Sequence, residues 1–236
     1  MKKIGILTIC LGKYDIFFDG LYNSFKNFFL PNHEKIFYVF NDSAIPEKYD
    51  VRSIQYQKMG WPFDSLKRFE MFLTIKDELL DNDFLFFLNA NMLCNNYVYD
   101  EILPAIDNDF LVGVNHPGFY NQTNLKFPYE RNPKSKFYIK EGEGKTYFQG
   151  CFNGGKSENF IGLSEILSEK INEDLTNNIM PIWHDESALN WFFNNKKPLI
   201  LDPSYSYPEN WNLPFDKKII QIDKNKWGGH NFLRTK

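Results

Sequence analysis

Cysteine is scarce in this chain of 236 residues. Cys10, Cys94 and Cys151 are its three cysteines, and no two of them form the C-x-x-C pairs that are typical of structural zinc sites. An odd number of cysteines argues against a disulfide scaffold and favours a reducing compartment. We therefore expect a cytoplasmic protein.

The chain also lacks a basic excess and a long apolar run. Its 27 basic residues face 30 acidic ones, which gives a net charge of −3 and little to attract a polyphosphate backbone. No stretch approaches the roughly 20 apolar residues that cross a bilayer, and the short run after Met1 ends too soon for a signal peptide. We expect no nucleic-acid partner and no integral membrane segment.

What the chain does have is a high aromatic content and, in its first half, apolar runs that alternate with helical spacing. Buried strands are expected at residues 4–9, 35–41, 53–56 and 83–88, and helices at 14–29 and 65–80, the second with Ser65 as N-cap. This alternation predicts a mostly parallel sheet flanked by helices. The ligand of such a sheet lies beyond the carboxyl ends of its strands, which here are segments 10–14 and 89–91.

The second half has a different texture. Residues 115–155 are rich in Gly, Pro, Tyr and Asn, which predicts loops and short strands of the kind that carry binding sites. Helical spacing returns at 159–174 and 187–194, and a short strand is expected at 199–201. Because no linker-like stretch marks the change, we expect one domain over 1–236, with a mobile basic tail at 224–236.

The first cluster with chemical potential is Trp183-His184-Asp185-Glu186. Glu186 is suited to act as a nucleophile, a general base or a charge stabiliser. The same residues also fit a helix start, with Asp185 as the N-cap and Glu186 in the first turn. Spacing alone leaves both interpretations open.

Three other clusters carry weaker signals. Asn89 and Asn91 follow a predicted strand; neutral amides are poor ligands for Mg²⁺ or Mn²⁺, and the pattern also fits an Asx turn. The segment 116–120, His-Pro-Gly-Phe-Tyr, suits a sugar, or is simply a turn. The glycines of 150–155 allow a close backbone approach to a ligand but are too irregular for a phosphate loop or a dinucleotide fingerprint.

Longer segments carry a family resemblance. They are W-P-F-D-S-L-K-R-F-E-M (61–71), D-F-L-F-F-L-N-A-N (83–91), H-P-G-F-Y (116–120), Y-E-R-N-P-K-S-K-F-Y-I (129–139), W-H-D-E-S-A-L-N (183–190) and K-K-P-L-I-L-D-P-S-Y (196–205). With them the chain resembles family six of the retaining glycosyltransferases, which includes the ABO blood-group transferases, the α-1,3-galactosyltransferases and the Forssman synthases. The resemblance implies a single-domain α/β fold of the GT-A type, a Rossmann-like mixed sheet flanked by helices, with a nucleotide-sugar half at about 1–113 and an acceptor half at about 114–223.

The resemblance also implies an activity. It is transfer of GalNAc from UDP-GalNAc, with retention, to the 3-hydroxyl of a β-galactoside, a fucosylated one being expected. One alternative is an α-1,3-galactosyltransferase that uses UDP-Gal as donor. A second alternative is a catalytically weakened relative that binds a UDP-sugar or a glycan. A glycoside hydrolase is disfavoured because Glu186 has no second carboxylate cluster as partner. Vertebrate members carry a membrane anchor, and we expect this chain to be of the soluble bacterial type.

Individual residues acquire roles from the same resemblance. Donor contacts are implied for Ile9, Cys10, Tyr14, Ser65, Arg68, Asn89, Asn91, Gln149, Gly150, Cys151 and Asp185. Cys151, together with Gln149, lies where the family selects GalNAc or Gal, and its modest size favours GalNAc. His116 and Trp183 would contact the acceptor galactose with Glu186, which would be the nucleophile or oxocarbenium stabiliser. Phe63 replaces a family carboxylate, so one donor contact is expected to be missing.

The main departure from the family is Asn89-Ala90-Asn91, where the vertebrate enzymes have Asp-x-Asp and hold Mn²⁺. We therefore expect no metal cofactor. The charge on the departing UDP must still be stabilised, and basic side chains are the candidates. They are Arg68 and, in a tail that would fold over the donor, Lys224, Lys226 and Arg234.

Overall fold

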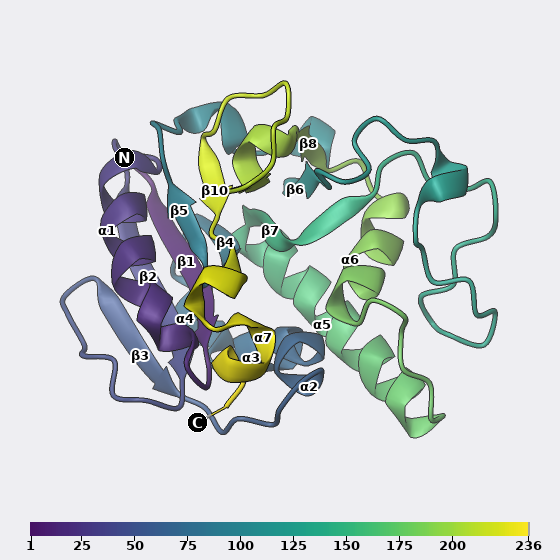
Figure 1. Ribbon diagram of the computed structural model, residues 1–236, viewed down its shortest axis with the longest axis horizontal. Helices are drawn as coiled ribbons and strands as arrows, with labels where there is room; N and C mark the ends of the chain where they lie inside the picture. The colour runs from purple at the N-terminus through teal and green to yellow at the C-terminus, as the bar shows by residue number, and fades with distance from the viewer. Residues whose placement is uncertain (236) are drawn as a thin grey trace.

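The computed structural model describes residues 1–235 and contains a seven-stranded sheet. Its strands are β1 (Lys3–Cys10), β2 (Glu34–Asn41), β3 (Val51–Gln55), β4 (Phe84–Asn89), β6 (Leu111–Asn115), β7 (Phe148–Lys156) and β8 (Leu199–Leu201). The order is β3-β2-β1-β4-β7-β6-β8 (Figure 1). Neighbouring strands are parallel except that β7 runs antiparallel to β4 and β6. The expected mixed α/β sheet is confirmed.

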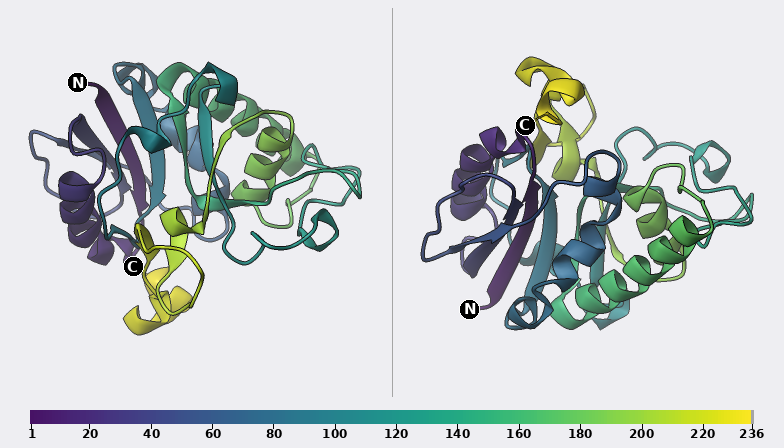
Figure 2. Two further views of the ribbon diagram at one scale, coloured as in Figure 1. Left: turned by 90° about the horizontal axis from the view of Figure 1, so that it is seen from above. Right: turned by 90° about the horizontal axis from the view of Figure 1, so that it is seen from below.

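Helices cover both faces of this sheet. They are α1 (Phe18–Phe28), α2 (Phe63–Leu66), α3 (Arg68–Leu73), α4 (Lys76–Leu80), α5 (Ser157–Thr176), α6 (Asp185–Asn194) and α7 (Gly229–Leu233). One core cluster joins the buried face of α1 to the sheet, and a second joins α3, α5 and α6 to the other face. Figure 2 shows α1 and α5 on opposite sides of the strands. None of these helices, within residues 1–235, has the length and apolarity that crossing a bilayer requires.

A second, smaller sheet lies beside the first. It has the order β5-β10-β9 and is built from β5 (Met92–Cys94), β9 (Tyr207–Pro208) and β10 (Ile219–Gln221). Short 3₁₀ turns complete the chain: η1 (Tyr14–Phe17), η2 (Asp100–Ile102), η3 (Ile106–Asn108), η4 (Asn124–Lys126), η5 (Pro203–Ser206) and η6 (Lys224–Trp227). Strand β10 leads directly into η6 and α7, the yellow segment of Figure 1.

The predicted helix over 65–80 is wrong in detail. The chain forms three short helices there, because Lys67 and the β-branched Ile75 leave helical geometry. Ser65 is not an N-cap: it lies inside α2, whose N-cap position is Pro62. The breaks allow α3 to point the Arg68 side chain into the protein, where its guanidinium reaches the carbonyl of Gly150.

Strand β7 is longer than the short strands expected for residues 115–155. Its glycines lower the intrinsic preference for a strand and hide it from pattern analysis. They are needed for close packing, since a Cβ on Gly154 would lie 2.5 Å from the Leu85 carbonyl oxygen. A Cβ on Gly155 would lie equally close to the carbonyl oxygen of Phe110.

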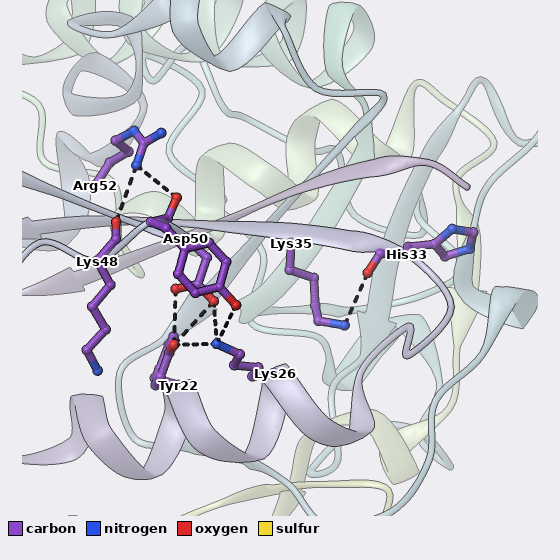
Figure 3. A network of polar contacts seen from close by, with 8 residues as sticks. Tyr22, Lys26, His33, Lys35, Lys48, Asp50 and Arg52 are labelled. Atoms are coloured by element: carbon purple, nitrogen blue, oxygen red, sulfur yellow. Dashed lines mark hydrogen bonds and ion pairs between the residues drawn. The ribbon is translucent and has the colours of Figure 1, made fainter.

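A polar network ties α1 to the turn before β3 (Figure 3). The Asp50 carboxylate accepts hydrogen bonds from Lys26 Nζ at 2.7 Å and from the Tyr22 hydroxyl at 3.0 Å. Lys26 also donates to the Tyr49 hydroxyl. Burial would raise the pKa of Asp50, but the bonds from Lys26 and Tyr22 outweigh it and hold this pKa below its usual value. None of these residues lines the pocket described next, so we assign the network to stability.

Candidate active site

A pocket of about 610 Å³ opens at the carboxyl ends of β1 and β4. Strand β7, helices α3 and α6 and the C-terminal segment complete its walls. Most of the predicted site residues line it: Ile9, Tyr14, Ser65, Arg68, Asn89, Asn91, Gln149, Gly150, Cys151, Trp183, Asp185, Glu186, Lys224 and Arg234. Residues from six separate segments are therefore brought together, at the sheet edge that the strand pattern predicted.

Cys10 and Lys226 do not line the pocket. Side chains alternate along a strand, so Ile9 and Leu11 face the pocket whereas Cys10 is buried in the core. The Lys226 ammonium pairs at 2.7 Å with the carboxylate of Glu209, which itself lines the pocket. Of the two lysines proposed to contact the diphosphate, Lys224 lines the pocket and Lys226 does not.

His116 also lies outside the pocket wall, behind Tyr147. Its ring centroid is 5.6 Å from that of Tyr147, and its Nδ1 accepts a hydrogen bond from the Gly118 N–H at 2.9 Å. Burial lowers the pKa of His116 to about 4, so the imidazole is neutral near pH 7. His116 is nevertheless half-buried and close to the pocket wall: a Cβ on Gly118 would lie 3.3 Å from the His116 ring and 3.7 Å from Trp211, which lines the pocket.

The Glu186 carboxylate is the most constrained group in the site. Its Oε1 accepts a hydrogen bond from the Tyr147 hydroxyl at 2.8 Å, and its Oε2 accepts one from the Gly150 N–H at 2.7 Å. Burial raises the pKa of Glu186 to about 7, and both hydrogen bonds oppose this rise. The carboxylate is thus fixed in position and close to its ionisation point at physiological pH.

Asp185 and Arg68 form a buried ion pair beside Glu186. Arg68 Nη1 lies 2.8 Å from Asp185 Oδ2 and donates to the Gly150 carbonyl oxygen at 2.6 Å. The guanidinium stacks over Phe87, and only 2% of Arg68 is exposed. Its Nε and Nη2 are buried without a hydrogen-bond partner among the described residues. Buried donors without a partner are rare in folded proteins; this guanidinium is held by Asp185, Gly150 and the Phe87 ring.

The helix-start interpretation of the Trp183–Glu186 segment is confirmed in part, and three of its residues line the pocket. Asp185 and Glu186 occupy the first turn of α6, where the helix dipole favours carboxylates. The N-cap position belongs to His184 rather than Asp185, and His184 adopts φ 53°, a left-handed conformation that non-glycine residues rarely adopt. This turn directs Trp183, Asp185 and Glu186 into the same pocket.

Two further basic side chains, both from the C-terminal segment, line the pocket. Lys224 Nζ lies 5.2 Å from the centre of the Tyr14 ring, and burial lowers the pKa of Lys224 to about 8. The Arg234 guanidinium stacks 4.6 Å from the Trp61 ring. With Arg68, these residues provide the positive charge that a diphosphate requires.

The two asparagines differ in their surroundings. Asn89 is half-buried on the pocket wall. Asn91 is buried and its Nδ2 donates to the Ile222 carbonyl oxygen at 2.8 Å, which ties the end of β4 to the segment before the tail. Within residues 1–235 no group of three or more His, Cys, Asp or Glu side chains is placed to hold a metal ion.

The basic tail forms η6 and α7 and packs beside the pocket. Leu233 is buried in the core, and its carbonyl oxygen accepts a hydrogen bond from the Lys13 N–H at 2.9 Å. The Lys58 ammonium donates to the Arg234 carbonyl oxygen. The last residue of the predicted tail, Lys236, lies outside the described residues.

Sequence reasoning missed several pocket residues. Trp61 and Trp211 line the mouth and, like Trp183, are about half exposed; exposed tryptophans next to Pro or Asn were the available signal. Phe63 packs against the core, and the following residue, Asp64, lines the pocket. A carboxylate is therefore present here, one position beyond the expected one.

Taken together, these features define a class. A mixed α/β sheet, a pocket at its strand ends, clustered basic groups and a buried pair of carboxylates describe a glycosyltransferase with a GT-A-like fold. The model of Glycosyltransferase family 6 matches residues 2–235, and the chain belongs to that family.

Several curated proteins are similar over nearly the whole chain. The O-antigen biosynthesis glycosyltransferase WbnI of Escherichia coli is 38% identical over 96% of this chain and 98% of its own length. The histo-blood group ABO system transferase 1 of Rattus norvegicus is 32% identical over 94% of this chain and 67% of its own. The globoside alpha-1,3-N-acetylgalactosaminyltransferase 1 of Gallus gallus is 30% identical over the same shares.

Proposed function

We propose that this glycosyltransferase transfers GalNAc from UDP-GalNAc to the 3-hydroxyl of a β-galactoside acceptor, with retention at the anomeric carbon and without a metal ion. The observation that carries the proposal is the Glu186 carboxylate, which Tyr147 and Gly150 hold at the base of the pocket. A fucosylated galactoside is the proposed acceptor. UDP-Gal is the alternative donor.

Retention requires a group on the face of the sugar opposite the leaving UDP. Glu186 supplies it, either as a nucleophile or as a fixed charge beside the oxocarbenium ion. The bond from C1 to the diphosphate oxygen breaks with its electron pair leaving on UDP. The acceptor oxygen then bonds to C1 on the face that UDP has left and gives its proton to the departing diphosphate oxygen. If Glu186 has formed a bond to C1, that bond breaks in the same step and its electron pair returns to the carboxylate.

The leaving diphosphate would be stabilised by side chains rather than by a cation. Asn89 and Asn91 stand at the strand end with neutral amides. Arg68, Lys224 and Arg234 line the same pocket. Preorganised cations in a site that excludes water stabilise developing negative charge without any metal ligand.

Donor and acceptor would occupy different parts of the pocket. Ile9 and Tyr14 offer the apolar surface that a uracil ring needs. Trp183, Trp61 and Trp211 form an exposed aromatic rim, and sugars lie with their apolar faces against such rings. The name of the Gallus gallus relative includes α-1,3-N-acetylgalactosaminyl transfer, which supports GalNAc as donor.

Release of UDP tests the proposal. The full chain would be incubated in excess EDTA with UDP-GalNAc or UDP-Gal and with lactose, 2′-fucosyllactose or no acceptor. The proposal predicts UDP release that depends on an acceptor and is fastest with UDP-GalNAc and 2′-fucosyllactose. Release that does not depend on acceptor would indicate a hydrolase. Tight UDP-sugar binding without turnover would indicate a binding protein.

A further inference from the structure

A closed polar cluster lies in the pocket wall next to Gly150. Its members are Gln149 and Cys151 on β7, Ser206 at the end of η5, and Gln221 on β10; we call it the Ser206 cluster. The Ser206 hydroxyl lies 2.5 Å from Gln149 Oε1 and 3.0 Å from Cys151 Sγ. Gln221 Nε2 lies 2.7 Å from Ser206 Oγ and 2.6 Å from Cys151 Sγ.

Ser206 is the centre of this cluster and is fully buried. Its O–H donates a hydrogen bond to the side-chain amide oxygen of Gln149, Oε1. Its Oγ accepts a hydrogen bond from the side-chain amide nitrogen of Gln221, Nε2. A buried hydroxyl that both donates and accepts a hydrogen bond fixes the groups around it, because breaking either bond leaves a buried polar atom without a partner. Ser206 itself does not line the pocket, whereas the other three residues do.

The cluster stands next to the reacting position. Gly150 donates its N–H to Glu186, and a Cβ on Gly150 would lie 3.2 Å from Asp185 Oδ2. Gln149 and Cys151, one residue before and after it, belong to the other face of the strand. Gln149, Cys151 and Gln221 nevertheless line the same pocket as the two carboxylates, so a sugar with its anomeric carbon at Glu186 shares that pocket with three members of the Ser206 cluster.

With its anomeric carbon at Glu186, a sugar donor brings the substituent on the adjacent carbon close to Gly150, the residue that Gln149 and Cys151 flank. A 2-acetamido group needs more room than a 2-hydroxyl group. Hydrogen bonds to Ser206 and Gln221 hold the Gln149 amide and the Cys151 thiol in the wall. Without those bonds, the flexible Gln149 side chain is free to rotate into the space in front of Gly150.

We propose that Ser206 and Gln221 are positioning residues that set the choice between 2-acetamido and 2-hydroxy hexose donors by holding Gln149 and Cys151 in place. Ser206 does so without touching the substrate. This inference rests on the proposed UDP-sugar transfer. It assigns part of the donor choice to η5 and β10, two elements that carry none of the residues predicted from the sequence.

The test compares the ratio of kcat/KM for UDP-GalNAc to that for UDP-Gal, with one acceptor, in the wild type and in Ser206→Ala and Gln221→Leu. We expect the ratio to fall about tenfold in both variants, as one lost hydrogen bond implies. The kcat/KM for UDP-Gal should stay within about threefold. Ser206→Thr, which keeps the hydroxyl, should restore the ratio.

Ser204→Ala is the matched control. Ser204 lies on the same 3₁₀ turn and is also buried, but its hydroxyl bonds to Asp202 and it lines no part of the pocket. Its donor ratio should equal that of the wild type. Affinity for UDP alone, measured by calorimetry, should be the same in all variants and shows that the fold and the nucleotide site are intact.

A ratio within twofold of the wild type in both test variants, with UDP affinity retained, would overturn the inference. So would an equal change in Ser204→Ala. If the wild type turns over neither donor, the proposed function fails on its own. The ratio of Kd values for the two UDP-sugars then replaces kcat/KM and is interpreted in the same way.

Discussion

The Glu186 carboxylate combines a fixed position with a raised pKa. It is fixed by two hydrogen-bond donors, and burial raises its pKa to about 7. Fixed geometry aims the charge at one point of the sugar. The raised pKa makes the carboxylate a better nucleophile than an ordinary glutamate, at the cost of losing charge in mild acid.

We expect Glu186→Gln to keep UDP-GalNAc affinity within a few fold and to lose transfer by at least about 10³-fold, because the amide keeps the shape but not the charge. Calorimetry and an initial-rate assay measure the two effects. Glu158→Gln on the exposed surface of α5 is the control and should behave as the wild type. Transfer within tenfold of the wild type in Glu186→Gln would remove Glu186 from the chemistry.

Tyr147→Phe should change the pH dependence of transfer. The Tyr147 hydroxyl lowers the pKa of Glu186, so its removal raises that pKa further above about 7. Because Glu186 must be ionised, the acid limb of the kcat profile should move to higher pH by about one unit. The rate should therefore fall several-fold near pH 6.5 and little near pH 8.5. An equal loss at every pH would mean that Tyr147 acts only on packing.

Single residues were predictable from the sequence to different degrees. Glu186 and Asp185 were found because acidic residues after a tryptophan and before a helix form a local signal. Arg68 fits a solvated helix face by type and was placed at the donor only through the family resemblance; its burial depends on a long-range contact with Gly150. Trp211 was missed because its one local signal, a tryptophan between two asparagines, does not separate a pocket rim from an ordinary loop.

At the scale of elements, the C-terminal segment decides whether the pocket is complete. Helices η6 and α7 place Lys224 and Arg234 beside residues from β1 and α3. The segment is anchored by the buried Leu233 side chain, by the Lys13–Leu233 backbone bond and by an edge contact between Phe17 and Trp227. These contacts fix the two basic side chains at the pocket.

Lys224→Met should weaken UDP binding by about tenfold at pH 7, because one charged contact to the diphosphate is lost. Burial lowers the pKa of Lys224 to about 8, so wild-type affinity should also fall above that pH as the ammonium loses its proton. Lys226→Met is the matched control: it breaks an exposed pair with Glu209 and should change UDP affinity little. Equal losses in both variants would contradict the assignment, and calorimetry measures them.

Elements with strong local patterns were predicted well, and those shaped by distant contacts were not. The strand 199–201 and the buried strands β1, β2 and β4 were found within a residue or two. The glycines of β7 and the bends at Lys67 and Ile75 follow from packing against other elements. Local propensity contains no information on such contacts.

For the whole molecule, stability and activity are located in different places. The network of Lys26, Tyr22, Tyr49 and Asp50 joins α1 to the sheet away from the pocket (Figure 3). The sheet order brings residues from both halves of the chain to one edge. The fold class was predictable from the alternation of elements, whereas the antiparallel insertion of β7 was not.

Asp50→Asn should lower the free energy of unfolding at pH 7 by about 1–3 kcal/mol and leave transfer at 25 °C unchanged. The pKa of Asp50 lies below its usual value in the folded protein. Its contribution is therefore present above the unfolded pKa of about 4 and is lost as the pH falls through the folded value. Urea denaturation at pH 7 and at about pH 2 measures this, with exposed Glu141→Gln as control. A difference between wild type and Asp50→Asn that is as large at the acidic pH would refute the ionic role.

The central claim is retaining transfer by Glu186 without a metal ion, and the most direct test is the structure of the product formed in EDTA. The reaction of UDP-GalNAc with 2′-fucosyllactose would be followed by proton NMR in chelator that exceeds all divalent metal. The account predicts an α-linked product on the 3-hydroxyl of galactose, formed at the same rate with or without added Mn²⁺. A β-linked product, or a product that forms only after Mn²⁺ is added, would contradict it.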